Sequence, residues 1–217
     1  MINRREFSAA AATTLALAGL GMPHLAFAQK KPEEGADYKT LDKRAPVDAP
    51  AGKIEVVEFF WYSCPHCNAF EPKLVAWSKK LPPDVVLKRV PVSFRDSFVP
   101  QQRLFYTLEA MGKLDELHSK VFEAIHVQRQ PTDKEDTIVA WAEKHGLDKA
   151  KFQETYNSFS VQTKTRRASQ LQDIYKVEGV PALGVAGRWY TDGTMAGNPE
   201  RALQVVDYLV AEARKSK

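Results

Sequence analysis

The sequence predicts an α/β protein whose sheet is interrupted by a long helical segment. Residues 54–94 show a strand, turn, helix and strand in succession. Apolar residues at helical spacing then dominate residues 96–175, and strand character returns at residues 182–191 before a last helix. Of the 217 residues, 44% are hydrophobic and 27% are charged. This composition is typical of a globular protein and excludes disordered, collagenous and coiled-coil classes.

The first 28 residues are predicted to be a cleaved export signal. Arg4 and Arg5 precede an apolar run over residues 8–20, and Ala-Phe-Ala at residues 26–28 provides a cleavage site before Gln29. The run is too short and too rich in alanine to span a bilayer about 30 Å thick, which disfavours a membrane anchor. The paired arginines also resemble a twin-arginine signal, and general secretion stays open beside it. The mature protein is therefore expected in the bacterial periplasm, where disulfides persist.

The net charge and the number of cysteines disfavour nucleic-acid binding and exclude a small fold held together by disulfides. The formal net charge is +4, and no stretch combines dense Lys and Arg with interleaved aromatic residues, so nucleic-acid binding is not expected. The chain has two cysteines, Cys64 and Cys67. A small fold stapled by disulfides is excluded, because a bridge that closes so tight a loop restrains almost no chain entropy. Nothing in the sequence indicates an obligate assembly, and a monomer is expected.

The first strands and the first helix are predicted around the cysteines. A charged segment, residues 29–37, is expected to be a frayed terminus, and residues 38–41 a short edge strand. Residues 54–60 form an apolar run interrupted by a carboxylate, which predicts a buried central strand. The helix that follows the cysteines should stop at Leu81-Pro82-Pro83, and alternation over residues 85–94 predicts a second strand.

The segment over residues 96–175 is predicted to hold several helices with short connections. Asp148 is expected to cap a short helix that ends at Tyr156. Ser160 is expected to cap the next helix, which reaches Tyr175.

The chain is predicted to end with two strands and a helix. Residues 182–186 and 189–191 have strand character, with a turn at Gly187 between them. The last helix begins near Pro199 and has an apolar face. Without the helical segment, the order of elements is therefore β-α-β followed by β-β-α.

The cysteine pair carries the predicted chemistry. A C-x-x-C motif at a strand-to-helix junction places Cys64 at the helix N-terminus, where free N–H groups and the helix dipole stabilise a thiolate. Cys67 lies one turn further in, so Cys64 is predicted to be the nucleophile and Cys67 the resolving thiol. Between them, His66 can add a positive charge or a donor, and Pro65 fixes the turn. Each unit by which the thiol pKa falls below ambient pH stabilises the reduced form by ~1.4 kcal/mol, or ~30 mV, and makes the disulfide a stronger oxidant.

Two other interpretations of the pair are weaker. Structural zinc needs four ligands, but the chain has no further cysteine, and His118, His126 and His145 show no tight ligand spacing. A purely structural disulfide is disfavoured by the short loop. A redox-active Cys64–Cys67 disulfide, with no cofactor and no metal, is therefore expected.

Several short motifs occur in order through nearly the whole mature chain. They are Val57-Glu58-Phe59-Phe60, Cys64-Pro65-His66-Cys67, Phe70-Glu71, Val92-Ser93-Phe94, Asn157-Ser158-Phe159 and Gly179-Val180-Pro181-Ala182. Together they resemble the DsbA-type periplasmic thiol:disulfide interchange proteins of the thioredoxin superfamily. The resemblance implies a thioredoxin fold formed by residues 29–95 and 176–217, with an all-helical domain, residues 96–175, inserted into it.

The resemblance also implies roles for residues outside the C-x-x-C motif. Pro181 would be a cis-proline that faces the disulfide, with Val180 giving backbone contacts to substrate; alternatively, Pro181 merely begins a strand. Glu58 and Glu71 match acidic positions near the family's site, and Arg89 falls where the family often has a basic partner. A carboxylate in an apolar strand is costly unless paired or solvated, which favours proton handling by Glu58. The alternative is a structural ion pair, in which Arg89 would keep Glu58 ionised.

The activity that the resemblance implies is the oxidation of reduced, unfolded exported proteins through a mixed disulfide at Cys64. A quinone-linked membrane protein of the DsbB type would reoxidise the enzyme. The run Phe60-Trp61-Tyr62 either docks unfolded chains or, as is commoner for such runs, belongs to the core. A disulfide isomerase or reductase of the same fold is disfavoured, because few residues precede Ile54 to form a dimerisation domain. The other alternative is a redox-inactive, chaperone-like binding module. Family members often carry a second, structural disulfide, which two cysteines cannot provide.

Overall fold

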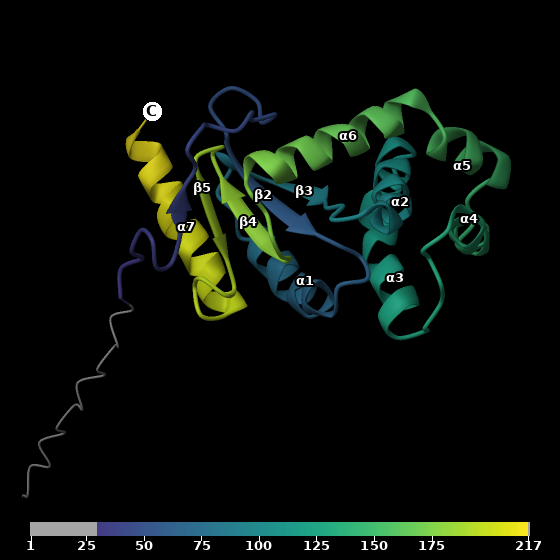
Figure 1. Ribbon diagram of the computed structural model, residues 1–217, viewed down its shortest axis with the longest axis horizontal. Coiled ribbons are helices and arrows are strands. Elements are labelled where there is room, and N and C mark those ends of the chain that lie inside the picture. The colour runs from purple at the N-terminus through teal and green to yellow at the C-terminus, as the bar shows by residue number, and fades with distance from the viewer. Residues whose placement is uncertain (1–29, 217) are drawn as a thin grey trace, which may run out of the picture. The chain divides into compact units, whose positions relative to one another are not determined.

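A five-stranded mixed sheet is the scaffold of the residues that the structure describes, 30–216 (Figure 1). In this computed structural model the strand order is β1-β5-β4-β2-β3. The strands are β1 (Lys39–Thr40), β2 (Ile54–Phe60), β3 (Val85–Pro91), β4 (Ala182–Val185) and β5 (Trp189–Asp192). β2 pairs with β3 in parallel, and the other pairs are antiparallel. The predicted export signal, residues 1–28, lies outside the described residues.

Seven α-helices and one short 3-10 helix accompany the sheet in the described part of the chain. They are α1 (Pro65–Ser78), η1 (Asp96–Phe98), α2 (Val99–Ala110), α3 (Leu114–His126), α4 (Glu135–Lys144), α5 (Lys149–Tyr156), α6 (Phe159–Ile174) and α7 (Pro199–Lys215). The elements η1 to α6 all lie between β3 and β4 in the chain, where the helical pattern predicts them (Figure 1). Among the described residues, 32–216 form one compact unit. Of the described helices, none combines the length and apolar character that crossing a bilayer requires.

Two apolar clusters cover the two faces of β2. One cluster contains Ile54 and Val56 together with residues of α1 and α7. The other contains Val57 and Phe59 together with residues of α2 to α6. Because side chains alternate along a strand, Glu58 points to the same side as Val56, toward α1. The alternation thus places a carboxylate under the helix that begins at the cysteines.

The predicted caps in the helical segment are right in one case and wrong in the other. Asp148 caps α5, as predicted, and its carboxylate accepts the N–H of Lys151 at 2.7 Å. Ser158, not Ser160, caps α6, because its hydroxyl accepts the N–H of Val161 at 3.2 Å. Both serines have the side chain of a good cap. The extended backbone at Ser158 makes it the residue that precedes the first turn.

The N-terminal turn and two element ends also differ from the prediction. Within the segment 29–37, expected to be frayed, the N–H of Asp37 donates to the carbonyl of Glu33 at 2.8 Å and closes a turn. The expectation of fraying is therefore wrong for this turn. Helix α1 ends at Ser78, and β3 ends at Pro91, each a few residues before the predicted end.

Candidate active site

The two cysteines lie where β2 leads into α1. Cys64 is the N-cap residue of α1, and Pro65 occupies the first helical turn. The side chain of Cys64 keeps some exposure, since the residue is 8% accessible, whereas Cys67 is fully buried. Both are free thiols in this structure. The structure thus confirms the predicted placement, with the first sulfur as the more accessible one.

The surroundings move the pKa values of the two thiols apart. The hydrogen bond with the Cys67 side chain lowers the pKa of Cys64 to about 6; burial opposes this, while the backbone N–H groups of Cys67 and His66 and the charge of His66 support it. Burial raises the pKa of Cys67 far above its ordinary value, and Cys64 and Glu58 add to the effect. At neutral pH, Cys64 is therefore mainly a thiolate and Cys67 a thiol.

The loop before β4 approaches Cys64 from the other side. The Val180–Pro181 peptide bond is cis, as the resemblance implies. The Val180 carbonyl oxygen lies 3.4 Å from the Cys64 Sγ and accepts its hydrogen bond when Cys64 is in the thiol form. Both loop residues are half-buried, and β4 begins directly after them. Two segments far apart in the sequence therefore meet at the accessible sulfur.

A buried carboxylate pair shares one guanidinium on the inner side of the cysteines. Glu58 and Arg89 are partners in the β2–β3 register, and Arg89 Nε donates to Glu58 Oε2 at 3.1 Å. Arg89 Nη2 donates to Glu71 Oε1, on α1, at 2.7 Å. Glu58 is 1% and Glu71 7% accessible, so the carboxylates are almost out of contact with water. The sequence predicted all three residues near the site, and the structure brings them together.

The two carboxyl groups have opposite pKa shifts. Burial raises the pKa of Glu58 to about 8; the charge of Arg89 opposes the rise and that of Glu71 adds to it. Burial also acts to raise the pKa of Glu71, but its contacts with His118 and Arg89 outweigh burial and lower it. The ion pair that the sequence left open is in place. Burial raises the pKa of Glu58 more than Arg89 lowers it, which favours the protonated form beside this ion pair.

His118 lies against this group, although its place in the sequence predicts no role there. His118, on α3, is 5% accessible, and its Nδ1 lies 2.8 Å from the hydroxyl oxygen of Tyr62. Its Nε2 lies 3.6 Å from Glu71 Oε1. A signal was present in the sequence, since His118 falls between Leu117 and Val121 on the apolar face of its helix. A lone histidine there did not reveal its partners, which come from other elements.

The aromatic run beside the cysteines belongs mostly to the core. Phe60 and Tyr62 are buried, with their rings 5.1 Å apart. Trp61 is half-buried and stacks on Phe98, with ring centroids 3.8 Å apart. Of the two interpretations of this run, the core one describes two of its three residues.

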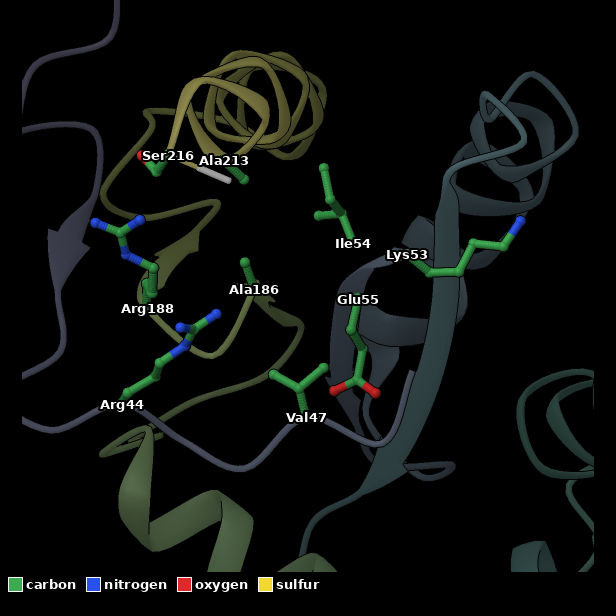
Figure 2. Close-up of a pocket in the computed structure, with 9 residues that line it drawn as sticks. All are labelled: Arg44, Val47, Lys53, Ile54, Glu55, Ala186, Arg188, Ala213 and Ser216. Carbon is green, nitrogen blue, oxygen red and sulfur yellow. The ribbon is translucent and has the colours of Figure 1, made fainter. Parts of the chain in front are cut away.

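A small cavity lies at the opposite end of β2 from the cysteines. It measures about 90 Å³ and is lined by Glu55, Arg44 and Arg188, among others (Figure 2). The predicted site residues are not part of its lining. Across residues 30–216, no group of three or more His, Cys, Asp or Glu side chains is placed to hold a metal ion.

Comparison with known proteins agrees with this geometry. Residues 55–204 match the family described as DSBA-like thioredoxin domain. The thiol:disulfide interchange protein DsbA of Bordetella pertussis is 46% identical over 203 residues, which cover 93% of this chain and 96% of that protein. The crystal structure of Pseudomonas aeruginosa DsbA superposes with a TM-score of 0.79 at 42% identity, over 84% of this chain and 94% of the other. The oxidoreductase DsbA from Xylella fastidiosa gives a TM-score of 0.79 at 32% identity, over 85% and 98% of the two chains. The chain therefore has the thioredoxin fold, belongs to the DsbA family and is a protein thiol:disulfide oxidoreductase.

Proposed function

We propose that this oxidoreductase donates a Cys64–Cys67 disulfide to reduced, unfolded exported proteins. The lowered pKa of Cys64 carries the proposal, because a stabilised thiolate stabilises the reduced form. A pKa one unit below pH 7 favours reduction by ~1.4 kcal/mol, or ~30 mV. The direction is that of a disulfide donor. The two sulfurs are the whole redox group of the proposal, which includes no cofactor or metal.

The reaction proceeds in two exchanges. A substrate thiolate attacks Cys64 Sγ, which forms a mixed disulfide and breaks the bond to Cys67. Cys67 leaves with the electron pair and takes up a proton, as its raised pKa favours. A second substrate thiolate then attacks the substrate sulfur of the mixed disulfide, and Cys64 leaves as a thiolate. The substrate loses two electrons and gains a disulfide, while the enzyme ends as a thiolate–thiol pair.

The residues around the sulfurs position these steps. Pro65 occupies the first turn of α1, where a residue without an N–H fits, and it fixes the backbone next to Cys64. His66 is exposed, and its charge and backbone N–H stabilise the Cys64 thiolate. Val180 and Pro181 present backbone to an extended substrate segment, since the Val180 carbonyl already lies against Cys64 Sγ.

Glu58 supplies the proton that Cys67 needs. With a pKa of about 8, its carboxyl group is mostly protonated at neutral pH. Glu58 lies on β2 and points to the side of the sheet covered by α1, the helix that holds Cys67. Arg89, in direct contact, then stabilises the carboxylate that remains after the proton is given up.

The same proposal covers the organisation and setting of the protein. The chain is divided into a thioredoxin-like domain, residues 29–95 and 176–217, and an inserted helical domain, residues 96–175. This division is supported by the chain path, which leaves the sheet after β3 and returns at β4. Residues 1–28 are a cleaved export signal, and the mature protein acts in the periplasm as a monomer. A quinone-linked membrane protein of the DsbB type reoxidises it.

Paired cysteine variants test the proposed chemistry. Oxidised wild-type protein should rapidly oxidise a synthetic peptide that carries two reduced cysteines, and Cys64→Ala should reduce the rate to that of buffer. Cys67→Ala is the matched control, because it keeps the accessible nucleophile: it should form a covalent adduct with oxidised glutathione, visible by mass spectrometry, which Cys64→Ala should not. Full oxidation by Cys64→Ala, or a wild-type reduction potential near that of thioredoxin, about −270 mV, would contradict the proposal.

A further inference from the structure

A chain of buried polar side chains links the loop before Cys64 to the carboxylate beneath the cysteines. The Tyr62 hydroxyl contacts His118 Nδ1 at 2.8 Å, and His118 Nε2 faces Glu71 Oε1 at 3.6 Å. Glu71 and Glu58 then bracket Arg89, at 2.7 and 3.1 Å. Four elements contribute to this chain: β2 with its following loop, α1, β3 and α3. His118, the residue from α3, has no role in the two exchange steps proposed for the cysteines.

We place the ring proton of His118 on Nε2, because this makes Nδ1 the acceptor of the Tyr62 hydroxyl and puts an N–H opposite Glu71. Burial lowers the pKa of His118, so the ring is neutral at neutral pH and has one N–H. A phenol has one proton to donate, and here the hydroxyl faces Nδ1. When the hydroxyl donates to Nδ1, the ring proton lies on Nε2, the nitrogen that faces Glu71. Nε2 has no hydrogen-bond partner among the described residues, so the negative charge of the nearby Glu71 carboxylate is what stabilises its buried N–H.

The charges in this cluster allow one exchangeable proton. Glu58 and Glu71 share the single guanidinium of Arg89, so the group is neutral when one carboxyl group is protonated and His118 is uncharged. Glu71 has the shorter contact to Arg89 and also faces the His118 N–H. Glu71 is therefore the better compensated anion, and Glu58 takes the proton.

We propose that His118, oriented by Tyr62, is a positioning residue that keeps the negative charge on Glu71 and thereby keeps the exchangeable proton on Glu58. The proposal rests on the proton role assigned to Glu58 under the proposed function. His118 does not touch the sulfurs in this scheme; it acts through Glu71 and Arg89.

Titratable and charged groups surround His118 on four elements. Tyr62 faces it from the loop after β2, Glu71 from α1, Arg89 from β3, and Asp115 from its own helix. The remaining rings packed around it are Phe60, Phe105 and Phe122. In this apolar setting a neutral N–H donor is favoured over an imidazolium ion.

Two substitutions of His118 distinguish whether the ring acts as a neutral hydrogen-bond donor or as a base that becomes protonated. His118→Gln keeps an oxygen to accept from Tyr62 and an N–H to face Glu71, but it cannot be protonated. His118→Leu removes both. The readout is the titration midpoint of Glu58 in the whole reduced protein, followed by ¹³C NMR of labelled glutamate carboxyl groups and assigned with Glu58→Gln. Val121→Ala leaves a cavity at a buried position of the same helix, outside the polar cluster. It is the control for effects that come only from lost stability.

We expect His118→Leu to lower the Glu58 midpoint by about one pH unit, because Glu71 then competes for the proton. His118→Gln should stay within about 0.3 unit of wild type, and Val121→Ala should leave the midpoint unchanged. A wild-type midpoint in His118→Leu would overturn the inference. So would a shift in His118→Gln as large as that in His118→Leu, which would make the imidazolium ion the active form.

A second variant keeps the inference testable if His118→Leu does not fold. Tyr62→Phe removes the hydroxyl that orients the ring and should lower the Glu58 midpoint in the same direction, by less. An unchanged midpoint in Tyr62→Phe would contradict the inference. The titration needs no turnover, so its failure is distinct from failure of the oxidase assay on the cysteine variants. An active oxidase with an unshifted Glu58 would refute the role of His118 alone.

Discussion

Glu55 and Glu58 lie on the same buried strand, β2, but in different surroundings. They are 2% and 1% accessible, and burial is the main cause of the raised pKa of each. Being three residues apart, they point to opposite faces of the sheet. Glu58 contacts Arg89 and lies near the cysteines. Glu55 accepts the backbone N–H of Asp48 at 3.0 Å with one oxygen, while the other has no partner in the described structure.

This difference shows that burial alone does not make a carboxyl group useful for proton transfer. Burial stabilises the protonated form at both positions, but a proton donor must also be able to release its proton. At Glu58 the adjacent guanidinium of Arg89 stabilises the carboxylate, and in the proposed reaction Cys67 is the acceptor of the proton. Glu55 faces the small cavity at the far end of the strand (Figure 2). We therefore interpret Glu58 as a functional residue and Glu55 as a residue whose buried charge lowers the free energy of unfolding.

The largest expected effect comes from removing the cation at the Glu58 end. Arg89→Met leaves two buried carboxyl groups without their shared partner, and we expect a loss of about 3–5 kcal/mol in the free energy of unfolding. Urea denaturation of the reduced protein at pH 7 measures it. Lys88→Met is the matched control on the neighbouring residue of β3, whose partner Asp48 has a side chain 76% exposed. That variant should lose less than about 1 kcal/mol. Equal losses in the two variants would remove the contrast between buried and exposed pairs.

A smaller and pH-dependent effect is expected for Glu58→Gln. Because the folded pKa, about 8, lies above the ordinary value of about 4.3, the protonated carboxyl contributes stability that is complete below the ordinary pKa and is lost as pH rises through about 8. Glutamine does not ionise, so the stability of the variant relative to wild type should rise by roughly 3 kcal/mol from pH 5 to pH 8. Urea unfolding of both reduced proteins at several pH values measures this, and the titration of Cys64 cancels in the difference. A difference that does not change with pH would mean that Glu58 is ionised throughout.

The cysteine end of β2 was largely predictable because its signals are local. A C-x-x-C motif after a strand and before a helix fixes the positions of both sulfurs by chain geometry alone. The cis bond at Pro181 was expected from resemblance to a family, because the residue types by themselves are compatible with either isomer. Glu58 was noticed as a charge in an apolar run, which is also a local signal.

The parts that escaped prediction depend on contacts between distant segments. His118 reaches Glu71 only because α3 packs against α1, and its spacing in the sequence says nothing about that contact. Whether Arg89 or burial governs Glu58 is a competition between two large opposing effects, which requires the actual depth and distances. The cap at Ser158 rather than Ser160 is a choice between two suitable side chains two residues apart, decided by the backbone.

The smallest expected effect tests the interpretation of the other end of the strand. Burial raises the pKa of Glu55, so its ionised form destabilises the folded protein once pH exceeds the ordinary value of about 4.3. Glu55→Gln keeps an oxygen for the Asp48 N–H and removes the charge; we therefore expect it to raise the free energy of unfolding by about 1 kcal/mol at pH 7, and the gain should vanish near pH 4. The rate of peptide oxidation should stay at the wild-type level, since the cysteines lie at the opposite end of β2. Urea unfolding at the two pH values and the oxidation assay check both parts. A loss of stability at pH 7 would show instead that the Glu55 carboxylate binds a favourable partner in the cavity. Both buried carboxyl groups of β2 would then have a partner, and the two ends of the strand would differ only in which partner that is.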